Sequence, residues 1–205
     1  MPSNLRRYQR IAAFYDLLEL PFEYGRYRRI RKLVFNGLSG RILDAGIGTG
    51  RNAEFYPRGA SIVGIDISPA MLARARRRLR QSPASAVELR EMDVTRLDFP
   101  AGCFDAAVAT FLFCVLSNDL QLPVLRELGR VVKPGGTVRL LEYVRPRRPL
   151  RRAIATLWEP WIAWAYAASF DRRTEEYIPK AGLEPVRAEF VVDDFVKLLT
   201  ARVPR

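Results

Sequence analysis

The chain has 205 residues, enough for one domain with a full hydrophobic core, and no linker or repeat divides it. Its formal net charge is +12, and it contains no histidine. The lack of histidine excludes an imidazole base, a histidine-ligated metal and a serine–histidine nucleophile. The two cysteines, Cys103 and Cys114, do not have metal-binding spacing, so we expect no metal site, a reducing cytoplasmic setting and a buried Cys114.

The N-terminal region, residues 1–36, begins with a basic amphipathic segment. Between positions 4 and 20, apolar side chains such as Tyr8, Ile11 and Tyr15 recur at helical spacing, with arginines between them. The pattern predicts a helix. Such a helix can lie in a lipid interface or pack as a lid over a bound ligand, and the sequence leaves both open.

A glycine-rich loop follows the first predicted strand. The apolar run Ile42-Leu43 precedes Asp44, and glycines then occupy positions 46, 48 and 50. A loop of this kind suits a nucleotide-like ligand at the carboxyl edge of a parallel sheet. The dinucleotide spacing GxGxxG is absent, however, and Asp44 beside the loop would repel a pyrophosphate. A ligand that joins a nucleoside to a positive centre fits better, and S-adenosylmethionine has both.

Two further strand-like runs end in acids. Residues 61–66 end in Asp66, about twenty residues past the loop, where an acid that binds ribose is expected. Residues 87–93 end in Asp93. Because the carboxyl ends of parallel strands meet at one edge of a sheet, Asp44, Asp66 and Asp93 should converge there. Each alone could instead be a helix cap or a turn residue, since aspartate favours both positions.

The loop, the acids and the later stretch Val131-Val132-Lys133-Pro134-Gly135-Gly136 together resemble the class I S-adenosylmethionine-dependent methyltransferases. The resemblance implies an α/β, Rossmann-like three-layer sandwich: a mostly parallel seven-stranded sheet, N-terminal helices and an antiparallel strand near residues 188–202. It implies S-adenosylmethionine as cofactor and S-adenosylhomocysteine as product. Asp44 would lie near the methionine ammonium, Asp66 at the ribose hydroxyls and Asp93 at the adenine amino group. The further cofactor contacts that it implies are Gly46, Gly48, Gly50, Ile67, Met71, Val94 and Thr110.

An aromatic and arginine-rich region occupies residues 145–180. All three tryptophans of the chain lie between 158 and 164, with arginines before and after them. The apolar length approaches a transmembrane span, but Glu159-Pro160 near its middle makes spanning costly. Tryptophan prefers the headgroup level of a bilayer, so we expect a stripe that rests in a membrane interface or lines a lipid groove, with core packing as the alternative. The separate arginine cluster at 74–80 favours a solvated helix face.

Several stretches narrow the resemblance to the Rhodobacter-type bacterial phosphatidylethanolamine N-methyltransferases. They lie at residues 46–52, 111–116, 140–143 and 157–170, of which the last is the most specific. The resemblance implies one methyltransferase domain over residues 1–205, bound peripherally to the inner face of the cytoplasmic membrane. Its substrate would be phosphatidylethanolamine, methylated in up to three steps ending at phosphatidylcholine. The charge and the arginine clusters independently favour an anionic membrane surface as a partner.

Candidate residues for the chemistry are limited by the missing histidine. The substrate amine must lose a proton before it attacks, and the nearest acceptors are Glu142 and Tyr143, expected just past the fifth strand, and Tyr15. Aromatic faces stabilise a methylated ammonium by roughly 0.5–2 kcal/mol each, and arginine suits a lipid phosphate. The candidate substrate-binding residues are Tyr27, Arg145, Arg147, Trp158, Tyr166 and Tyr177.

Three other functions remain open. The basic charge is compatible with nucleic-acid methylation. However, Thr110-Phe111-Leu112-Phe113 stands where enzymes that methylate nucleic-acid amino groups carry Asn/Asp-Pro-Pro-aromatic, so we expect no nucleic-acid partner. A quinone or sterol C-methyltransferase shares Tyr15-Asp16 and the fold. A non-enzymatic membrane-binding protein is disfavoured because every cofactor position carries a suitable residue. Separately, we expect the protein to be a monomer.

Overall fold

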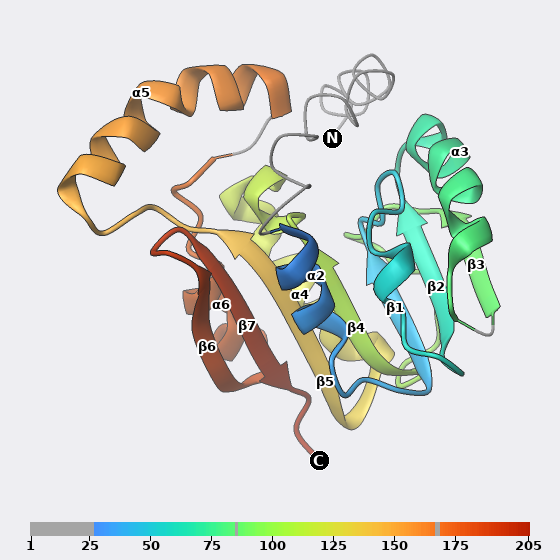
Figure 1. Cartoon of the computed structure of the whole chain (residues 1–205). Helices are drawn as coiled ribbons and strands as arrows, with labels where there is room; N and C mark the ends of the chain where they lie inside the picture. Colours follow the sequence, from blue (N-terminus) through green and yellow to red (C-terminus); the bar gives the residue numbers. More distant parts are fainter. Residues whose placement is uncertain (1–26, 85, 167–168) are drawn as a thin grey trace.

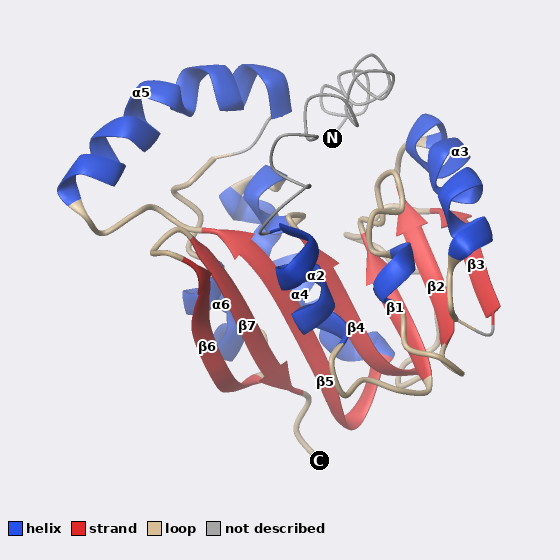
Figure 2. Ribbon diagram, viewed as in Figure 1, coloured by secondary structure: helices blue, strands red, loops and turns tan. Residues whose placement is uncertain are grey.

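The computed structural model describes residues 27–84, 86–166 and 169–205, without the side chains of Gln81 and residues 162–166. Seven strands within these ranges form one sheet in the order β3-β2-β1-β4-β5-β7-β6 (Figure 2). They are β1 (Arg41–Ala45), β2 (Ser61–Asp66), β3 (Ala86–Glu91), β4 (Phe104–Thr110), β5 (Val132–Tyr143), β6 (Glu184–Val192) and β7 (Val196–Arg202). β7 pairs antiparallel with both of its neighbours, and the other pairs are parallel. The predicted sheet, with its antiparallel strand near residue 202, is confirmed.

Helices form a layer on each face of the sheet (Figure 1). One face is covered by α2 (Arg28–Phe35) and α3 (Pro69–Arg78), and the other by α4 (Asn118–Val131) and α6 (Thr174–Lys180). The remaining described α-helix, α5 (Pro149–Tyr166), follows β5 and lies beyond the carboxyl edge of the parallel strands (Figure 1). The short 3-10 helices are η2 (Ala53–Phe55), η3 (Leu79–Gln81) and η4 (Phe113–Val115).

Side-chain alternation along the strands divides the core between the two faces. Ile42 and Leu43 are neighbours in β1 and both fully buried, but Ile42 packs on the side of α2 and α3 whereas Leu43 packs on the side of α4. Successive strand residues point to opposite faces, so a continuously apolar strand must be covered on both sides. On α4, Val124, Leu125 and Leu128 are buried at helical spacing. The two helical layers thereby leave the carboxyl edge of the sheet as the place where loops can meet a ligand.

The helix after β2 begins at a capped turn that orders the edge of the sheet. Ser68 is the N-cap, and its hydroxyl accepts a hydrogen bond from the Met71 N–H at 3.4 Å. Within the arginine cluster at 74–80, the side chains at 76, 77 and 80 are exposed, as predicted. Arg78 instead turns back and donates to the Thr49 carbonyl at 2.7 Å. This contact ties α3 to the glycine-rich loop.

One predicted boundary is wrong. β5 includes Glu142 and Tyr143, which pair with Lys197 and Val196 of β7, so neither residue lies past the strand. Antiparallel pairing with a distant C-terminal strand extends β5, and the local sequence carries no signal of that partner. The amphipathic helix predicted at 4–20 lies outside the described residues.

Candidate functional site: a cofactor pocket at the carboxyl edge of the sheet

A pocket opens at the carboxyl edge beside β1, where the strand order reverses between β1 and β4. In open α/β sheets a ligand usually binds here, because the loops that follow the two neighbouring strands diverge. The predicted cofactor contacts that line the pocket are Gly46, Gly48, Asp66, Ile67, Met71, Asp93, Val94 and Thr110. Asp44 and Gly50 are not among the lining residues.

Asp66 is held at the end of β2 by two backbone N–H groups. Its Oδ2 accepts a hydrogen bond from the Gly48 N–H and its Oδ1 accepts one from the Ser68 N–H, each at 2.9 Å. Burial raises the pKa of this carboxyl, and the two N–H bonds oppose the rise. A carboxylate offers about four lone-pair sites. Asp66 therefore keeps acceptor capacity for hydroxyl groups of a ligand in the pocket.

The glycines of the loop have two different roles. Gly48 has a φ of +56°, and an added Cβ would meet no described atom within 4 Å. Since Gly48 lines the pocket, a side chain there would occupy space that a ligand needs. At Gly50, an added Cβ would lie 3.0 Å from the Cα of Ala75 in α3. Gly50 therefore allows the loop to approach the helix and shapes the pocket from behind.

Asp44 is fully buried in a polar network behind the pocket. Its Oδ2 accepts hydrogen bonds from the Tyr56 hydroxyl at 2.6 Å and from Asn52 Nδ2 at 3.0 Å. Asn52 Nδ2 also lies 3.2 Å from the Thr110 hydroxyl, and Asn52 and Thr110 both line the pocket. Burial raises the pKa of Asp44 to about 6, while its bonds with Tyr56 and Asn52 act to lower it. A contact between Asp44 and the cofactor stays a prediction, because Asn52 takes the lining position.

Arg31 and Asn52 are site residues that the sequence motifs did not single out. Arg31 is buried on α2, and its Nη1 donates to Asn52 Oδ1 at 3.0 Å. Both residues line the pocket, and a guanidinium there suits a carboxylate group of the ligand. A signal for Arg31 was present in the sequence. Arg31 shares a helix face with Ile30 and Val34, which are buried, and an arginine on a buried face needs a partner there.

Comparisons with known proteins agree with this geometry. A profile of the methyltransferase domain matches residues 42–136. The chain is 34% identical over 180 residues to a phosphatidylethanolamine N-methyltransferase of Cereibacter sphaeroides, covering 83% of this chain and 84% of that protein. The chain belongs to the class I S-adenosylmethionine-dependent methyltransferases.

One further relative and one solved structure extend the comparison. A ubiquinone/menaquinone biosynthesis C-methyltransferase of Citrifermentans bemidjiense is 32% identical to this methyltransferase over 192 residues, covering 88% of this chain and 80% of that protein. The crystal structure of a geranyl diphosphate C-methyltransferase from Streptomyces coelicolor, in complex with S-adenosyl-L-homocysteine, shares the fold. The match between the two structures covers 86% of this chain and 80% of the Streptomyces chain, with a TM-score of 0.69 and 15% sequence identity.

S-adenosylmethionine is the cofactor of this methyltransferase family, and the groups in the pocket fit it. When bound, it supplies an electrophilic methyl group on a sulfonium. Asp66 would accept from the ribose hydroxyls, and Arg31 would hold the cofactor carboxylate. Apolar side chains, among them Ile67 and Val94, offer surfaces for the adenine ring. Asp93, two residues past β3, accepts from the Thr95 N–H at 2.9 Å through Oδ1, and its contact with the adenine amino group stays a prediction.

Glu142 supports one wall of the methyltransferase pocket from behind. Its carboxyl is only 2% exposed; Oε1 accepts from the Phe113 N–H at 3.0 Å and Oε2 from the Cys114 N–H at 2.9 Å. Cys114 is buried, as predicted, and the next residues, Val115 and Leu116, line the pocket. Burial raises the pKa of Glu142 to about 8, although the backbone N–H bonds act to lower it. The geometry makes Glu142 a positioning residue for η4, and its role as proton acceptor stays a prediction.

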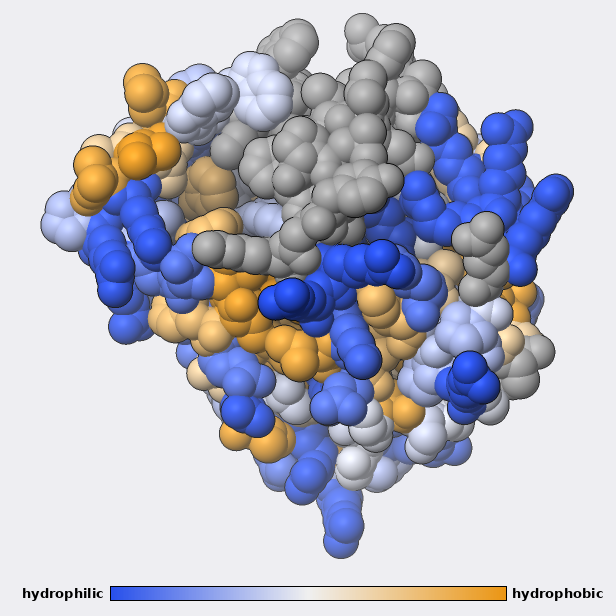
Figure 3. Space-filling model, in the orientation of Figure 1, coloured by the Kyte–Doolittle hydropathy of each residue, from blue (hydrophilic) through white to orange (hydrophobic). Residues whose placement is uncertain are grey.

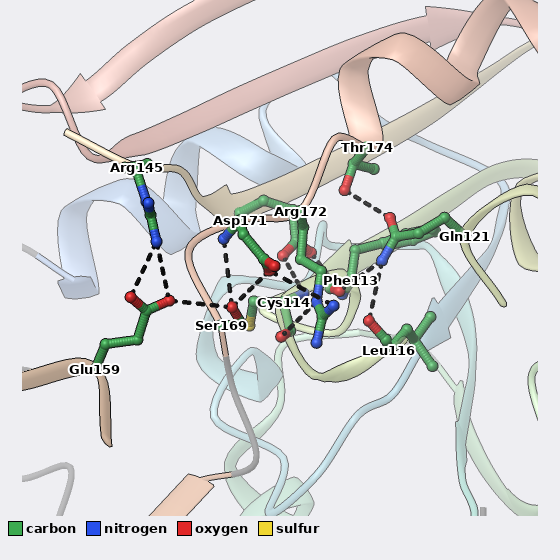
Figure 4. A network of polar contacts seen from close by, with 11 residues as sticks. Phe113, Cys114, Leu116, Gln121, Arg145, Glu159, Ser169, Asp171, Arg172 and Thr174 are labelled. Carbon is green, nitrogen blue, oxygen red and sulfur yellow. Dashed lines mark hydrogen bonds and ion pairs between the residues drawn. The ribbon is translucent and has the colours of Figure 1, made fainter. Parts of the chain in front are cut away.

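The same wall is held from α4 and from the segment that follows α5 (Figure 4). Gln121 donates through Nε2 to the Phe113 carbonyl at 2.8 Å, and the Thr174 hydroxyl donates to Gln121 Oε1 at 2.7 Å. The Ser169 N–H donates to the Cys114 carbonyl at 2.9 Å. The pocket wall is therefore connected to the chain that leaves the C-terminal end of α5.

An aromatic cluster adjoins the pocket at Phe111. Phe111 lines the pocket with a φ of +56°, and its ring stacks on that of Tyr143 with centroids 4.6 Å apart. The Tyr143 hydroxyl lies 3.1 Å from the Tyr27 hydroxyl, and the Tyr27 ring is tilted against Phe111 at 5.7 Å. Phe170 and Phe195 also contact the Tyr143 ring. The structure thus brings together Tyr143, a predicted catalytic residue, and Tyr27, a predicted substrate-binding residue.

Three predicted substrate-binding residues with described side chains lie on or before α5 and are not among the lining residues of the pocket. Arg145 Nη2 forms an ion pair with Glu159 Oε2 at 3.0 Å (Figure 4). The guanidinium of Arg147 stands over the Phe190 ring at 5.6 Å. Trp158 is exposed on α5. These residues lie in the part of the chain that passes over the carboxyl edge, and their contact with a substrate stays a prediction.

The structure does not bring Tyr177 to the pocket. Tyr177 lies on α6 and packs against the core on the side of α4, with Lys180 Nζ 5.2 Å from its ring centroid. Helical spacing alone does not indicate which face of the sheet a helix will cover. Tyr15 lies outside the described residues, and Tyr166 ends α5 with its side chain outside the description.

Proposed function

We propose that this methyltransferase N-methylates phosphatidylethanolamine, in up to three steps ending at phosphatidylcholine, at the inner face of the cytoplasmic membrane. The observation that carries the proposal is the aromatic cluster at the pocket wall, where Phe111 stacks on Tyr143. The substrate nitrogen becomes larger and finally a permanent cation, and ring faces stabilise such a cation by roughly 0.5–2 kcal/mol each. The identity with the enzyme of C. sphaeroides supports the same substrate.

Proton removal is the first chemical requirement of the proposed reaction. The ethanolamine nitrogen is an ammonium in water, and it must lose a proton before it forms the new bond to the methyl carbon. Burial beside the aromatic cluster disfavours the charged amine and lowers its pKa. Tyr143 and Tyr27, with hydroxyl oxygens 3.1 Å apart, offer a route by which this proton leaves. Each step then consumes one methyl group and releases one proton, and the protein contributes mainly alignment.

The lipid headgroup is proposed to meet the chain between β5 and α5. Arg145 and Arg147 follow β5 at the carboxyl edge, and a guanidinium can bind a phosphate through two parallel hydrogen bonds. Trp158 and Tyr166 on α5 would lie near the headgroup level, where such side chains are stabilised. Tyr15 remains a further proposed proton acceptor from the N-terminal region.

The decisive test is a labelled-methyl assay on liposomes. Purified protein and labelled S-adenosylmethionine are mixed with phosphatidylethanolamine, with and without phosphatidylglycerol, and the lipids are separated. Label in mono-, di- and trimethylated lipid is expected, with stimulation by the anionic lipid. Absence of lipid label from a protein that still binds S-adenosylmethionine in calorimetry would contradict the proposed substrate.

Quinone C-methylation is a second candidate, favoured by the identity with the enzyme of C. bemidjiense. The same liposomes loaded with a demethylated menaquinone in its reduced form test it directly. Label that appears only in the quinone would replace the lipid proposal. Label in the amine lipid alone would exclude the quinone as the substrate.

A further inference from the structure

Helix α5 faces the body of the protein with a row of mostly polar side chains. Its apolar face is not the face that packs there. Arg151, Ala155 and Glu159 are spaced four residues apart and are partly buried. Arg151 forms ion pairs with Asp194 at 2.7 Å and with Asp193 at 3.1 Å, in the turn between β6 and β7. Glu159 is paired with an arginine that precedes the helix. Ion pairs and a small residue therefore attach α5 to the rest of the structure.

The apolar face of α5 points away from the body. Within residues 149–161, this face consists of Leu150, Ile154, Leu157, Trp158 and Trp161, all exposed, with Leu150 at 74% and Leu157 at 79%. At 100° per residue, these side chains fall within an arc of about 100°, centred about 110° from the attached row. Figure 3 shows hydrophobic side chains gathered over α5 at the upper left of the molecule.

This arrangement inverts what is normal for an amphipathic helix of a water-soluble fold. Such a helix packs its apolar stripe on the core, yet no residue between 149 and 161 is buried. A contiguous exposed apolar patch of this kind marks a surface with a partner. Within the described ranges, no helix is both long enough and apolar enough to cross a bilayer.

We propose that α5 is an in-plane membrane helix, whose outward apolar face inserts into the interface of an anionic lipid bilayer. Arg147, Arg148 and Arg152 are exposed at its N-terminal end and complement anionic headgroups. The net charge of +12 opposes docking of a second copy of the chain on this face. The choice of lipid as occupant rests in part on the proposed function.

The position of α5 places the lipid surface next to the cofactor pocket. α5 lies beyond the carboxyl edge, the same edge at which the pocket opens (Figure 1). The chain that leaves it donates from Ser169 to the Cys114 carbonyl, one residue before the pocket-lining Val115 (Figure 4). A docked α5 would hold the pocket mouth against the headgroups, so that a lipid amine enters without leaving the bilayer.

Tryptophan fluorescence tests the docking face directly, because all three tryptophans of the chain lie between 158 and 164. The probe is vesicles of equal parts phosphatidylcholine and phosphatidylglycerol, compared with pure phosphatidylcholine. We expect a blue shift of emission and co-sedimentation with the anionic vesicles, weakened by added salt. Leu157→Glu should lower vesicle binding at least tenfold. Val186→Glu, a matched change at an exposed apolar residue of β6, should leave it within twofold.

The outcomes separate docking from substrate choice. Calorimetry with S-adenosylmethionine verifies that each variant is folded. Equal vesicle binding by wild type, Leu157→Glu and Val186→Glu would overturn the docking face, and so would self-association through α5 without vesicle binding. Vesicle binding that Leu157→Glu abolishes, in a protein that does not methylate phosphatidylethanolamine, would keep the docking face and reject only the proposed substrate.

Discussion

Replacement of Glu142 by glutamine should change how the stability of this methyltransferase depends on pH. Both carboxylate oxygens of Glu142 accept backbone N–H bonds at the start of η4, inside a buried environment. Burial raises the pKa of this group from 4.5 to about 8. Glutamine keeps the size of the side chain but does not titrate. A comparison of the two proteins therefore isolates the pH-dependent contribution of Glu142 to stability.

The size of the effect follows from the difference in proton binding between the two states. A group whose pKa is raised by folding contributes stability that is complete below its unfolded pKa and is lost as the pH rises through its folded pKa. A rise of about 3.5 pKa units corresponds to an upper limit of about 5 kcal/mol, lost at about 1.4 kcal/mol per pH unit. For Glu142 this window runs from 4.5 to about 8. Asp44, whose pKa is raised to about 6, titrates in both proteins, so its contribution cancels when their unfolding free energies are compared.

The assay is urea unfolding of the wild type and Glu142→Gln between about pH 5 and pH 9. At the acidic end we expect the variant to be less stable by about 1–3 kcal/mol, because the glutamine amide presents a donor to one of the two N–H groups. Toward the basic end the wild type should lose stability relative to the variant, and the order should reverse. A difference in unfolding free energy that is constant across this range would refute a raised pKa at Glu142.

Four other substitutions test the pocket, the proton route and the core. Asp66→Asn should weaken S-adenosylmethionine binding at least about tenfold in calorimetry, since charged hydrogen bonds contribute about 1.5–3 kcal/mol; an unchanged Kd would remove Asp66 from the ribose site. Tyr143→Phe should keep cofactor binding and lose most turnover, and near-normal turnover would remove Tyr143 from proton handling. Tyr27→Phe deletes the partner hydroxyl alone and shows whether the pair acts together. Leu125→Ala, fully buried on α4, should cost about 2–5 kcal/mol in urea unfolding without altering the cofactor Kd, and a loss below 1 kcal/mol would contradict close packing there.

The fold and most of the residues that line the pocket could be predicted from the sequence because their signals are local. A parallel strand, the loop after it and the next helix are continuous in sequence, so the local sequence is enough to place Gly48 and Asp66 at the carboxyl edge of the sheet. Ile67 directly follows the end of β2, and Val94 lies three residues past the end of β3. Asn52 lies at the end of the same glycine stretch, so the same local reasoning could have predicted it as a site residue.

Contacts between distant segments could not be predicted in this way. The sequence offers both Tyr177 and Tyr143 as site residues, yet only Tyr143 lies in the aromatic cluster beside the pocket. Side-chain periodicity predicts a helix but not the face of the sheet that it covers. The sequence offers Glu142 as a candidate proton acceptor, and only its distances to the η4 amides show that it also holds a wall of the pocket.

The sequence by itself determined a class I methyltransferase sheet, a cofactor site at its carboxyl edge and an aromatic, arginine-flanked segment after β5. The tertiary structure alone decided which face of that segment is exposed. Its amphipathic pattern is compatible with an apolar face that is either buried or exposed, because periodicity specifies a face and not its neighbour. The ion pairs from Arg151 to the turn between β6 and β7 join residues more than forty positions apart, and they turn the apolar face of α5 outward.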